Sequence, residues 1–133
     1  MAGAFTWPVR VYWEDTDAGG VVYYANYLKF LERARSEWLR ALGFEQPELL
    51  ARHGGMFVVK RVEVDYLLPA RFNDSLIVEA VLAEQNKASL LMVQRILRDD
   101  AILVSARVTL VWVKENTFKP ARIPAEILQS LTA

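Results

Sequence analysis

The chain has 133 residues, of which 53% are hydrophobic, 11% are aromatic and 24% are charged. Sixteen Lys and Arg residues are balanced by sixteen Asp and Glu residues, so the formal net charge is zero. A chain of this length and composition can bury about 70% of its extended surface around one core, which excludes a mainly disordered protein. The lack of net positive charge argues against a protein whose main task is to bind nucleic acid. We therefore expect one domain over residues 1–133.

Cysteine and long apolar runs are both missing from the sequence. Without cysteine, a disulfide-stabilised fold, a thiolate nucleophile and a zinc site built from sulfur ligands are excluded. The longest apolar run has five residues, Val21 to Ala25, whereas a helix that spans a membrane needs about 20. Residues Met1 to Thr6 lack the basic start and the apolar stretch of a signal peptide. We expect a cytoplasmic protein without a membrane span.

A first strand is predicted over Val9–Glu14, directly after Pro8. An unusual acidic loop follows, in which three carboxylates occur between positions 14 and 17 and are followed by Gly19-Gly20. The two glycines allow a positive φ or a close approach to another backbone segment. The loop then leads through a short apolar run into a helix.

The residues alone leave two interpretations of this acidic loop open. Acidic residues before a helix often cap the helix or form an exposed turn, without any role in catalysis. Alternatively, the free N–H groups of the helix N-terminus stabilise an oxygen that gains negative charge, while a neighbouring carboxylate acts on the same carbonyl. A metal site built from Glu14, Asp15 and Asp17 is a weaker interpretation, because one short loop supplies too few oxygen ligands.

A long amphipathic helix is predicted over residues 26–42. Its apolar residues recur at spacings of three and four and are Tyr27, Phe30, Leu31, Ala34, Trp38, Ala41 and Leu42. Asn26 is a suitable N-cap, and Gly43 is a suitable stop at the other end. We expect the large side chains of this stripe to belong to the core rather than to a substrate pocket.

A shorter helix is predicted over residues 46–53, with Pro47 in its first turn and Gly54-Gly55 after its end. His53 is the only histidine of the chain and lies near the end of this helix. Because no Ser-His-Asp spacing accompanies it, we interpret it as a helix-terminus or surface residue rather than as a catalytic one.

Alternation with a period of two predicts the remaining strands, which are 62–66, 75–84, 88–98 and 102–112. Turn residues separate the last three strands, which are therefore expected to form an antiparallel meander. A last short helix fits residues 124–131. Together with the first strand, this order predicts an α+β fold in which one long helix covers a five-stranded sheet.

One helix cannot cover both faces of such a sheet. The apolar residues assigned to the second face are Leu90, Met92, Ile96, Val111 and Val113. In a monomer these side chains would be exposed to water as an apolar surface. We therefore expect self-association, most simply as a symmetric dimer.

The segment from Tyr12 to Arg35 resembles the signature of the 4-hydroxybenzoyl-CoA thioesterase family, above all its Tol-Pal-associated acyl-CoA thioesterase branch. The residues that carry the likeness are Glu14-Asp15-Thr16-Asp17-Ala18-Gly19-Gly20-Val21-Val22-Tyr23, Ala25-Asn26-Tyr27 and Glu32-Arg33-Ala34-Arg35. It continues through Phe57-Val58-Val59, Pro69-Ala70-Arg71 and Lys119-Pro120. The resemblance therefore covers nearly the whole chain.

The resemblance implies a hotdog fold, with a five-stranded antiparallel sheet wrapped around one long helix, and active sites at the interface of a homodimer or homotetramer. It implies an acyl-CoA thioesterase that needs no cofactor and no metal. By position, Asp17 matches the catalytic aspartate of the family, and Tyr24 matches the residue whose backbone N–H polarises the thioester carbonyl. The branch usually has a histidine where this chain has Tyr24, so an imidazole role is lost here.

Further substrate contacts follow from the same resemblance. Lys87, in a predicted turn between two strands, matches the place where family members present basic side chains to the nucleotide of CoA. Weaker candidates for this contact are Lys60, Arg61 and Arg71. For each of these basic residues, an ordinary solvated surface charge is the competing interpretation. Tyr23 and Val59 are close to the loop and to the strand expected to face it, and we assign both to the acyl pocket.

We therefore interpret the protein as an enzyme that hydrolyses short-chain, medium-chain or aromatic acyl-CoA thioesters. Asp17 either attacks the carbonyl to form a mixed anhydride or activates a water molecule as a general base. One alternative is a hotdog hydratase or dehydratase, which needs a histidine or an acid beside the acyl β-carbon. The other is a noncatalytic module that binds acyl carrier protein through Lys and Arg side chains.

Overall fold

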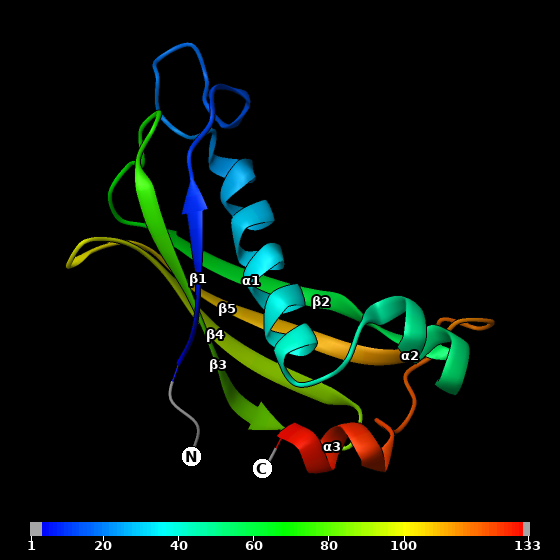
Figure 1. The fold of residues 1–133 in the computed structure, drawn as a ribbon. Coiled ribbons are helices and arrows are strands. Elements are labelled where there is room, and N and C mark those ends of the chain that lie inside the picture. Colours follow the sequence, from blue (N-terminus) through cyan, green and yellow to red (C-terminus); the bar gives the residue numbers. More distant parts are fainter. Residues whose placement is uncertain (1–3, 132–133) are drawn as a thin grey trace.

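Five strands form one antiparallel sheet in the order β1-β3-β4-β5-β2 (Figure 1). In this computed structural model, which describes residues 4–131, they are Phe5–Arg10 (β1), Gly55–Tyr66 (β2), Ser75–Gln85 (β3), Ser89–Arg98 (β4) and Ala101–Lys114 (β5). Residues 1–3 and 132–133 of the predicted domain, including the start of the N-terminal stretch considered above, lie outside the described range. The strands β3, β4 and β5 form the predicted meander.

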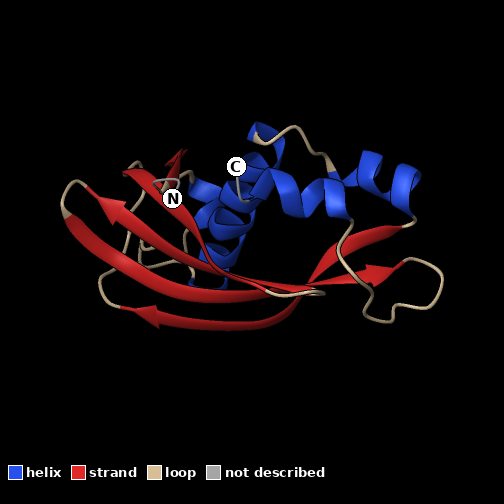
Figure 2. Ribbon diagram, turned by 90° about the horizontal axis from the view of Figure 1, so that it is seen from below, coloured by secondary structure: helices blue, strands red, loops and turns tan. Residues whose placement is uncertain are grey.

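The helices are α1 (Tyr27–Ala41), α2 (Gln46–His53) and α3 (Ala125–Leu131), with short 3-10 turns at Trp13–Asp15 (η1) and Tyr24–Asn26 (η2). All three helices lie on one side of the sheet, and the long strands curve beneath α1 (Figure 2). This confirms the predicted α+β hotdog architecture. No helix within residues 4–131 is long and apolar enough to cross a membrane.

The first strand lies earlier in the chain than predicted, at Phe5–Arg10 instead of residues 9–14. It pairs with β3 from its first residue to its last. Pro8 is tolerated inside it because β1 is an edge strand, where a missing N–H removes no ladder hydrogen bond. After Arg10 the chain bends into η1, so residues 11–14 leave the sheet.

The long helix is confirmed, and it ends as predicted at Gly43, which has a φ of 95°. Asn26 occupies the N-cap position as predicted, but its side chain does not cap the helix. Asn26 already has a helical backbone, with a φ of −71° and a ψ of −23°, and its side chain makes no capping hydrogen bond. The η2 turn continues directly into α1, so the amide side chain of Asn26 is free to bind elsewhere.

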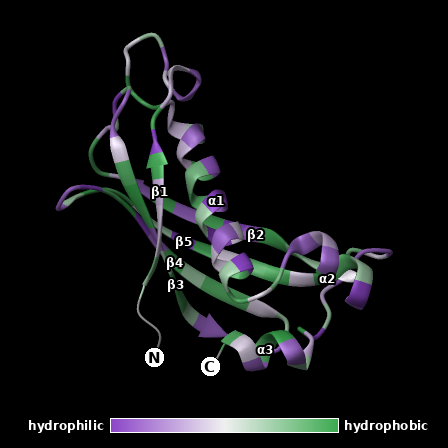
Figure 3. Ribbon diagram, in the orientation of Figure 1, coloured by the Kyte–Doolittle hydropathy of each residue, from purple (hydrophilic) through white to green (hydrophobic). Residues whose placement is uncertain are grey.

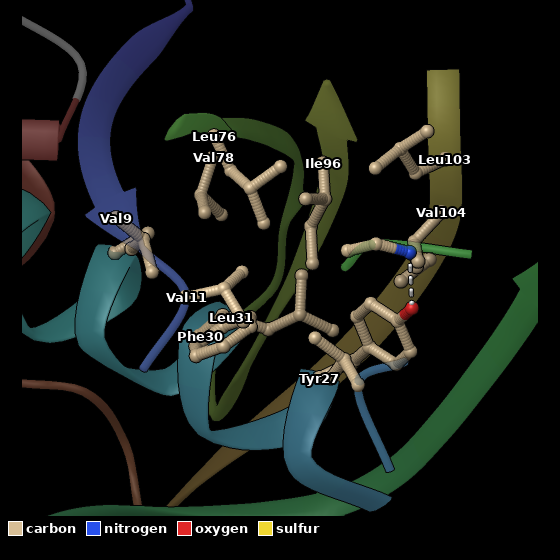
Figure 4. Packing of buried hydrophobic residues seen from close by; sticks show 14 residues of the cluster. Val9, Val11, Tyr27, Phe30, Leu31, Leu76, Val78, Ile96, Leu103 and Val104 are labelled. Atoms are coloured by element: carbon tan, nitrogen blue, oxygen red, sulfur yellow. Dashed lines mark hydrogen bonds between the residues drawn. The ribbon is translucent and has the colours of Figure 1, made fainter. Parts of the chain in front are cut away.

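The core lies between the helices and the inner face of the sheet, and it has two parts. Beneath the N-terminal half of α1 (Figure 4) it includes Val9, Val11, Tyr27, Phe30, Leu31, Leu76, Val78, Ile96, Leu103 and Val104. Around the C-terminal half of α1 it includes Trp38, Leu39, Phe44, Leu49, Phe57, Leu90, Met92, Trp112, Ile123 and Ile127. The predicted stripe residues Tyr27, Phe30, Leu31, Ala34 and Trp38 are thus core residues, whereas Leu42 is only partly buried and Ala41 is exposed. The outer turns of α1 are mainly hydrophilic (Figure 3). Complete burial of one such large side chain contributes about 1.5–3 kcal/mol.

The assignment of Leu90, Met92 and Ile96 to the far face of the sheet is wrong. All three are at most 1% exposed and pack under the helices. Because side chains alternate along β4, the far face carries Leu91, Val93 and Leu97 instead, and these are only partly exposed. Val111 and Val113, the other two residues of the predicted far face, are 8% and 4% exposed. The five predicted residues therefore expose almost no apolar surface, and the expectation of self-association has to rest on another surface.

Candidate active site

The acidic loop folds into a small hairpin that is hydrogen-bonded to itself. The Asp17 N–H donates to the Val21 carbonyl at 2.9 Å, and the Gly20 N–H donates to the Asp17 carbonyl at 3.1 Å. Gly20 has a φ of 78°. A Cβ on Gly19 would lie 3.2 Å from Asp17 Oδ1, and that oxygen accepts the Gly19 N–H at 2.8 Å. The two glycines thus provide the positive φ and the close approach that the sequence predicts.

Asp15 is the buried carboxylate of this loop, with only 6% of the residue exposed. Its Oδ2 accepts the Tyr12 N–H at 2.8 Å, and its Oδ1 accepts an N–H of the Asn26 side chain at 2.7 Å. Its carbonyl accepts the Tyr23 N–H at 3.0 Å. Asp15 therefore ties the start of the loop to the start of the helix, which explains why the Asn26 side chain does not cap the helix.

The metal interpretation of the loop has no support from this geometry. Both carboxylate oxygens of Asp15 are occupied by N–H donors, so they do not face a cation. Over the described residues 4–131, no group of three or more His, Asp or Glu side chains could hold a metal ion.

Asp17 has the opposite environment, because its side chain is exposed in the single chain. One of its oxygens accepts the Gly19 N–H, and no Lys, Arg or His within residues 4–131 forms an ion pair with it. One chain alone therefore neither buries nor neutralises this carboxylate. A substrate or a second subunit has direct access to it.

Tyr24 lies on the arm of the hairpin that returns past Asp17. Tyr24 begins η2, so its N–H has no acceptor inside the turn. No other group within residues 4–131 accepts a hydrogen bond from this N–H. Thr16 forms a β-bridge with Val22, which keeps the two arms side by side. The side chains of Tyr23 and Tyr24 are 50% and 62% exposed, with ring centroids 5.0 Å apart. The structure thus brings Asp17, Tyr23 and Tyr24 together at the N-terminal end of α1.

An apolar hollow of about 280 Å³ lies beside Tyr24. Its lining consists of Val22, Tyr24, Tyr27, Tyr66, Leu67, Leu68 and Pro69. The Tyr27 hydroxyl accepts the Ala70 N–H at 2.9 Å, shown as a dashed line in Figure 4, and so holds the segment after β2 against α1. Burial raises the pKa of Tyr27, although the Ala70 hydrogen bond acts in the other direction. This phenol therefore stays protonated and serves as part of the wall.

A larger cavity of about 440 Å³ lies beside the C-terminal half of α1. Its apolar lining consists of Leu39, Phe44, Pro47, Phe57, Val59 and Leu110. Val59, which we assigned to the acyl pocket, is therefore separated from Asp17 of the same chain and lines this second cavity instead. Lys60 follows it as an exposed residue at a bulge in β2.

Lys87 and Asp17 lie at opposite ends of β3. The Asp17 hairpin contacts the segment just before β3, since the Phe72 N–H donates to the Gly20 carbonyl at 3.2 Å. Lys87 follows the end of β3 at Gln85, and a strand of this length extends over about 35 Å. One substrate can therefore contact both residues only if they belong to different chains.

His53 lies at the C-terminal end of α2, as interpreted from the sequence. Its ring is 6.4 Å from that of Trp112, and its Nε2 is 3.8 Å from Glu126 Oε2. It has no contact with the acidic loop. The structure therefore places no histidine where a hydratase would need one.

Arg35 belongs to the Glu32-Arg33-Ala34-Arg35 motif, but the sequence predicts no role for it, and in the structure it is a buried polar residue. It is 9% exposed and lines the larger cavity, and its Nη1 donates to Gln94 Oε1 at 3.0 Å. Burial lowers the pKa of the guanidinium below its usual range, while the charge of Glu32 acts against this shift. One signal was present in the sequence, because Arg35 follows Leu31 by four positions and so falls on the apolar stripe of α1.

Comparisons with known proteins show which family the chain belongs to. The model of the family described as the Thioesterase-like superfamily matches residues 11–131. The acyl-CoA thioesterase YbgC of Haemophilus influenzae is 46% identical over 127 residues, which cover 96% of this chain and 93% of that protein. The acyl-CoA thioester hydrolase YbgC of Escherichia coli O6:H1 is 44% identical over 125 residues, or 93% and 92% of the two chains. A probable thioesterase from Bartonella henselae has a TM-score of 0.86 at 36% identity and covers 92% of this chain and 100% of its own.

Proposed function

The chain belongs to the thioesterase-like superfamily and is a thioester hydrolase, and we propose that it hydrolyses acyl-CoA with Asp17 as the reacting carboxylate. The observation that carries this proposal is the hairpin at the start of α1. It holds an exposed carboxylate, Asp17, and an N–H without an acceptor, Tyr24, on neighbouring arms. Proteins that are 44% and 46% identical to this chain are named for acyl-CoA thioester hydrolysis.

The chemistry needs few groups. The thioester carbonyl accepts the Tyr24 N–H, and the positive end of the helix dipole stabilises the negative charge that develops on this oxygen. Asp17 then either attacks the carbonyl carbon, so that the C–S bond breaks and water later hydrolyses the mixed anhydride, or removes a proton from an attacking water. The CoA thiol has a pKa of about 8.5, so its thiolate leaves without a strong general acid.

The active form in this proposal is a dimer formed along β2. The sheet has two edge strands, β1 and β2. β1 is short and contains Pro8, whereas β2 extends over Gly55–Tyr66 without proline and exposes Val59 and Val62 by 47% and 37%. A long unprotected edge with apolar side chains is suited to pairing with another strand.

The charges on β2 favour one antiparallel register between two copies. When Val62 faces Val62 of the partner subunit, Arg61 faces Glu63 of the partner subunit and the opposite signs attract. When the axis passes through Arg61 or Glu63 instead, like charges face each other. The Val62 register also continues the ion pair of 3.4 Å between Arg61 Nη2 and Glu63 Oε1 on each chain.

This register makes a composite site out of the two ends of α1. It places Tyr66 of the partner subunit opposite Val58, next to the cavity that Val59 lines. Because Tyr24 and Tyr66 have ring centroids 6.2 Å apart, the Asp17 hairpin of the partner subunit arrives at the same place. We therefore assign Val59 to the acyl pocket of the partner's carboxylate, with Tyr23 beside that carboxylate.

The same register brings the predicted CoA contacts to the site. Val111 pairs with Val58 on one side and with Ser89 on the other, so the turn that contains Lys87 lies about 10 Å from Val58, two strands away. Lys60 is exposed on β2 itself. We assign both lysines to the phosphate groups of CoA.

Steady-state hydrolysis of a panel of acyl-CoA substrates tests the proposal, with free CoA detected by a thiol reagent. We expect Asp17→Asn to lower kcat by about 10³-fold or more, because the nucleophile or base is lost. Glu14→Gln is the matched control, since this exposed carboxylate of the same loop has no assigned role. Full turnover by a folded Asp17→Asn protein would reject the assignment. Formation of a double bond without CoA release would indicate a hydratase, and binding of acyl carrier protein without turnover would indicate the module.

Charge exchange on β2 tests the dimer. We expect Arg61→Glu to weaken association, because it places two acidic side chains opposite each other, and the double variant Arg61→Glu with Glu63→Arg to restore it. Sedimentation equilibrium measures the mass of each variant. A stable dimer of the single variant would contradict this register.

A further inference from the structure

The larger cavity contains a buried positive charge without a negative partner. Arg35 is 9% exposed, and within residues 4–131 no carboxylate lies within 4.0 Å of its guanidinium. Glu32 is the acidic residue on the same turn of α1, but its Oε2 accepts a hydrogen bond from the Ser36 hydroxyl at 3.2 Å. Glu32 therefore acts on the guanidinium through its charge but forms no ion pair with it.

The contacts that Arg35 does make leave most of its donors unused. Nη1 donates to Gln94 Oε1 at 3.0 Å, and the Gln94 side chain in turn donates to the Leu31 carbonyl at 3.1 Å. Gln94 carries no charge, and its hydrogen bond with Arg35 uses one of the five N–H groups of the guanidinium. Within residues 4–131, no Arg35 nitrogen is both fully buried and without a partner, so the remaining donors are accessible to a ligand in the cavity. A carboxylate on these donors would pair with a charge that is largely removed from water.

Arg40 lines the same cavity and shows the contrast. Its Nη1 lies 2.6 Å from Glu37 Oε2, and its Nε lies 3.1 Å from Glu45 Oε1. The positive charge at the rim is thus already neutralised by two carboxylates. The charged residues of the lining are Glu32, Arg35, Arg40 and Glu45, and within residues 4–131 Arg35 is the cation among them without an ion pair.

The rest of the cavity is suited to a hydrocarbon chain. Its walls are apolar at Leu39, Phe44 and Phe57, and its volume of about 440 Å³ is in the range of small-molecule sites. A ligand that fits has an apolar body and an anionic end. A carboxylate meets the planar fork of a guanidinium with two hydrogen bonds, whereas a phenol is neutral at pH 7 and cannot offset the charge.

We propose that Arg35 binds a carboxylate at the far end of the acyl group, so that the preferred substrates are CoA monothioesters of dicarboxylic acids. This inference depends on the proposed function, since it places the acyl chain in the cavity of one subunit and the thioester at Asp17 of the partner subunit. Arg35 is a specificity residue in this arrangement, because it contacts the end of the substrate and not the reacting atoms.

Pairs of substrates of equal length test the proposal in the wild-type enzyme. We expect kcat/KM for glutaryl-CoA, adipyl-CoA or suberyl-CoA to exceed that of the matching pentanoyl-, hexanoyl- or octanoyl-CoA by about tenfold or more at one length. The difference should lie mainly in KM, since the contact is made in the ground state and in the transition state alike. A preference for the neutral substrate at every length would overturn the proposal.

Variants locate the effect. Arg35→Gln should remove the preference while hydrolysis of the neutral substrate stays within a few fold of the wild type, and Arg35→Lys should keep part of the preference. Arg40→Gln is the matched control and should keep all of it, because its charge is already paired. An unchanged preference in Arg35→Gln would contradict the proposal, and so would a loss of dimer mass without a change in preference, since Arg35 would then bind a carboxylate of the partner subunit.

A binding measurement separates this inference from the proposed function. Adipate, the free dicarboxylate, is titrated calorimetrically into the wild-type protein and into Arg35→Gln, with hexanamide, a neutral molecule of the same chain length as hexanoate, as the control. Binding of adipate that Arg35→Gln abolishes would support the anion site even if no acyl-CoA is hydrolysed. Equal binding of adipate and hexanamide would overturn it, whatever the activity. If Arg35→Gln does not fold, the proposal is still tested by the pairs of substrates and by the two titrations, all with the wild-type protein.

Discussion

The buried polar groups at the two ends of α1 differ in how far the chain itself satisfies their hydrogen bonds and charges. At the N-terminal end, the buried carboxylate of Asp15 accepts one N–H on each oxygen, so the loop is satisfied within one chain. Along the C-terminal half, the buried guanidinium of Arg35 has one neutral acceptor and no carboxylate partner among the residues described. The Asp15 carboxylate is satisfied within one chain, whereas the Arg35 guanidinium has further donors that a ligand can use.

The two groups therefore suit different tasks: the Asp15 network positions the loop, and the Arg35 guanidinium is available to recognise a ligand. A saturated network holds its members in one arrangement, and it thereby positions the exposed Asp17 and the free Tyr24 N–H on a rigid hairpin. An unsaturated charge is available to a ligand. Changes at the loop end should therefore lower stability and turnover together, while changes at the cavity end should affect substrate binding first.

Removal of the Asp15 carboxylate should have the largest effect. In Asp15→Ala the Tyr12 N–H and the Asn26 amide lose their acceptor, and unsatisfied buried groups cost about 1–3 kcal/mol each. We expect the free energy of unfolding to fall by about 3 kcal/mol and kcat to fall with it, as measured by urea denaturation and CoA release. Glu14→Ala, a change at the exposed neighbour, should leave both unchanged. Normal stability of Asp15→Ala would show that other contacts hold the hairpin.

Gly55→Ala perturbs the cavity end instead. A Cβ at this position would lie 2.5 Å from Trp112 Cζ2, and the Trp112 ring packs against Phe57 with centroids 5.1 Å apart. We expect a loss of about 2 kcal/mol from overpacking, together with a higher KM because Phe57 lines the cavity. A double-mutant cycle with Trp112→Phe measures the coupling. Additive effects would mean that the two residues do not clash.

Tyr27→Phe tests the wall of the smaller hollow beside Tyr24, and it should lower the stability less than the two changes above. The Tyr27 hydroxyl is the acceptor of the buried Ala70 N–H, so its removal should cost about 1–2 kcal/mol of stability. Because Tyr27 makes no assigned contact with the reacting atoms, kcat should change little. Tyr66→Phe is the control, since this tyrosine is 45% exposed. A larger loss in the control than in Tyr27→Phe would contradict the role of the hydrogen bond.

Asp74 should give the smallest effect, and it should depend on pH. Burial raises the pKa of this carboxyl, but the Arg71 N–H and the Arg98 guanidinium outweigh burial, so the pKa lies below its ordinary value of 3.8. A lowered pKa stabilises the fold above that value, and the contribution is lost as the pH falls through the pKa of the folded state. Asp74→Asn should therefore lower stability by about 1 kcal/mol at pH 7, and the difference in Tm from wild type should shrink below about pH 4. A constant difference down to pH 2 would contradict this linkage.

Local patterns in the sequence determined most of the elements. The apolar stripe at spacings of three and four, together with Gly43, determined the long helix, because both act over a few neighbouring residues. The acidic loop with Gly19-Gly20 identified the hairpin and, through a family resemblance, drew attention to Asp17. Each of these features depends only on residues that are close together in the sequence.

Tertiary structure decided what depends on distant partners. Alternation along β4 shows that Leu90 and Met92 share a face, but which face is inward depends on where α1 packs. Asparagine is a residue type that often caps helices, yet the side chain of Asn26 binds the carboxylate of Asp15, eleven positions earlier. Arg35 is visible in the sequence as a charge on an apolar stripe, but its burial against Gln94, 59 positions away, and its lack of a carboxylate partner arise only from the packing of helix on sheet. A one-dimensional pattern records the type and spacing of residues, whereas the satisfaction of a buried charge is a property of everything that surrounds it in space.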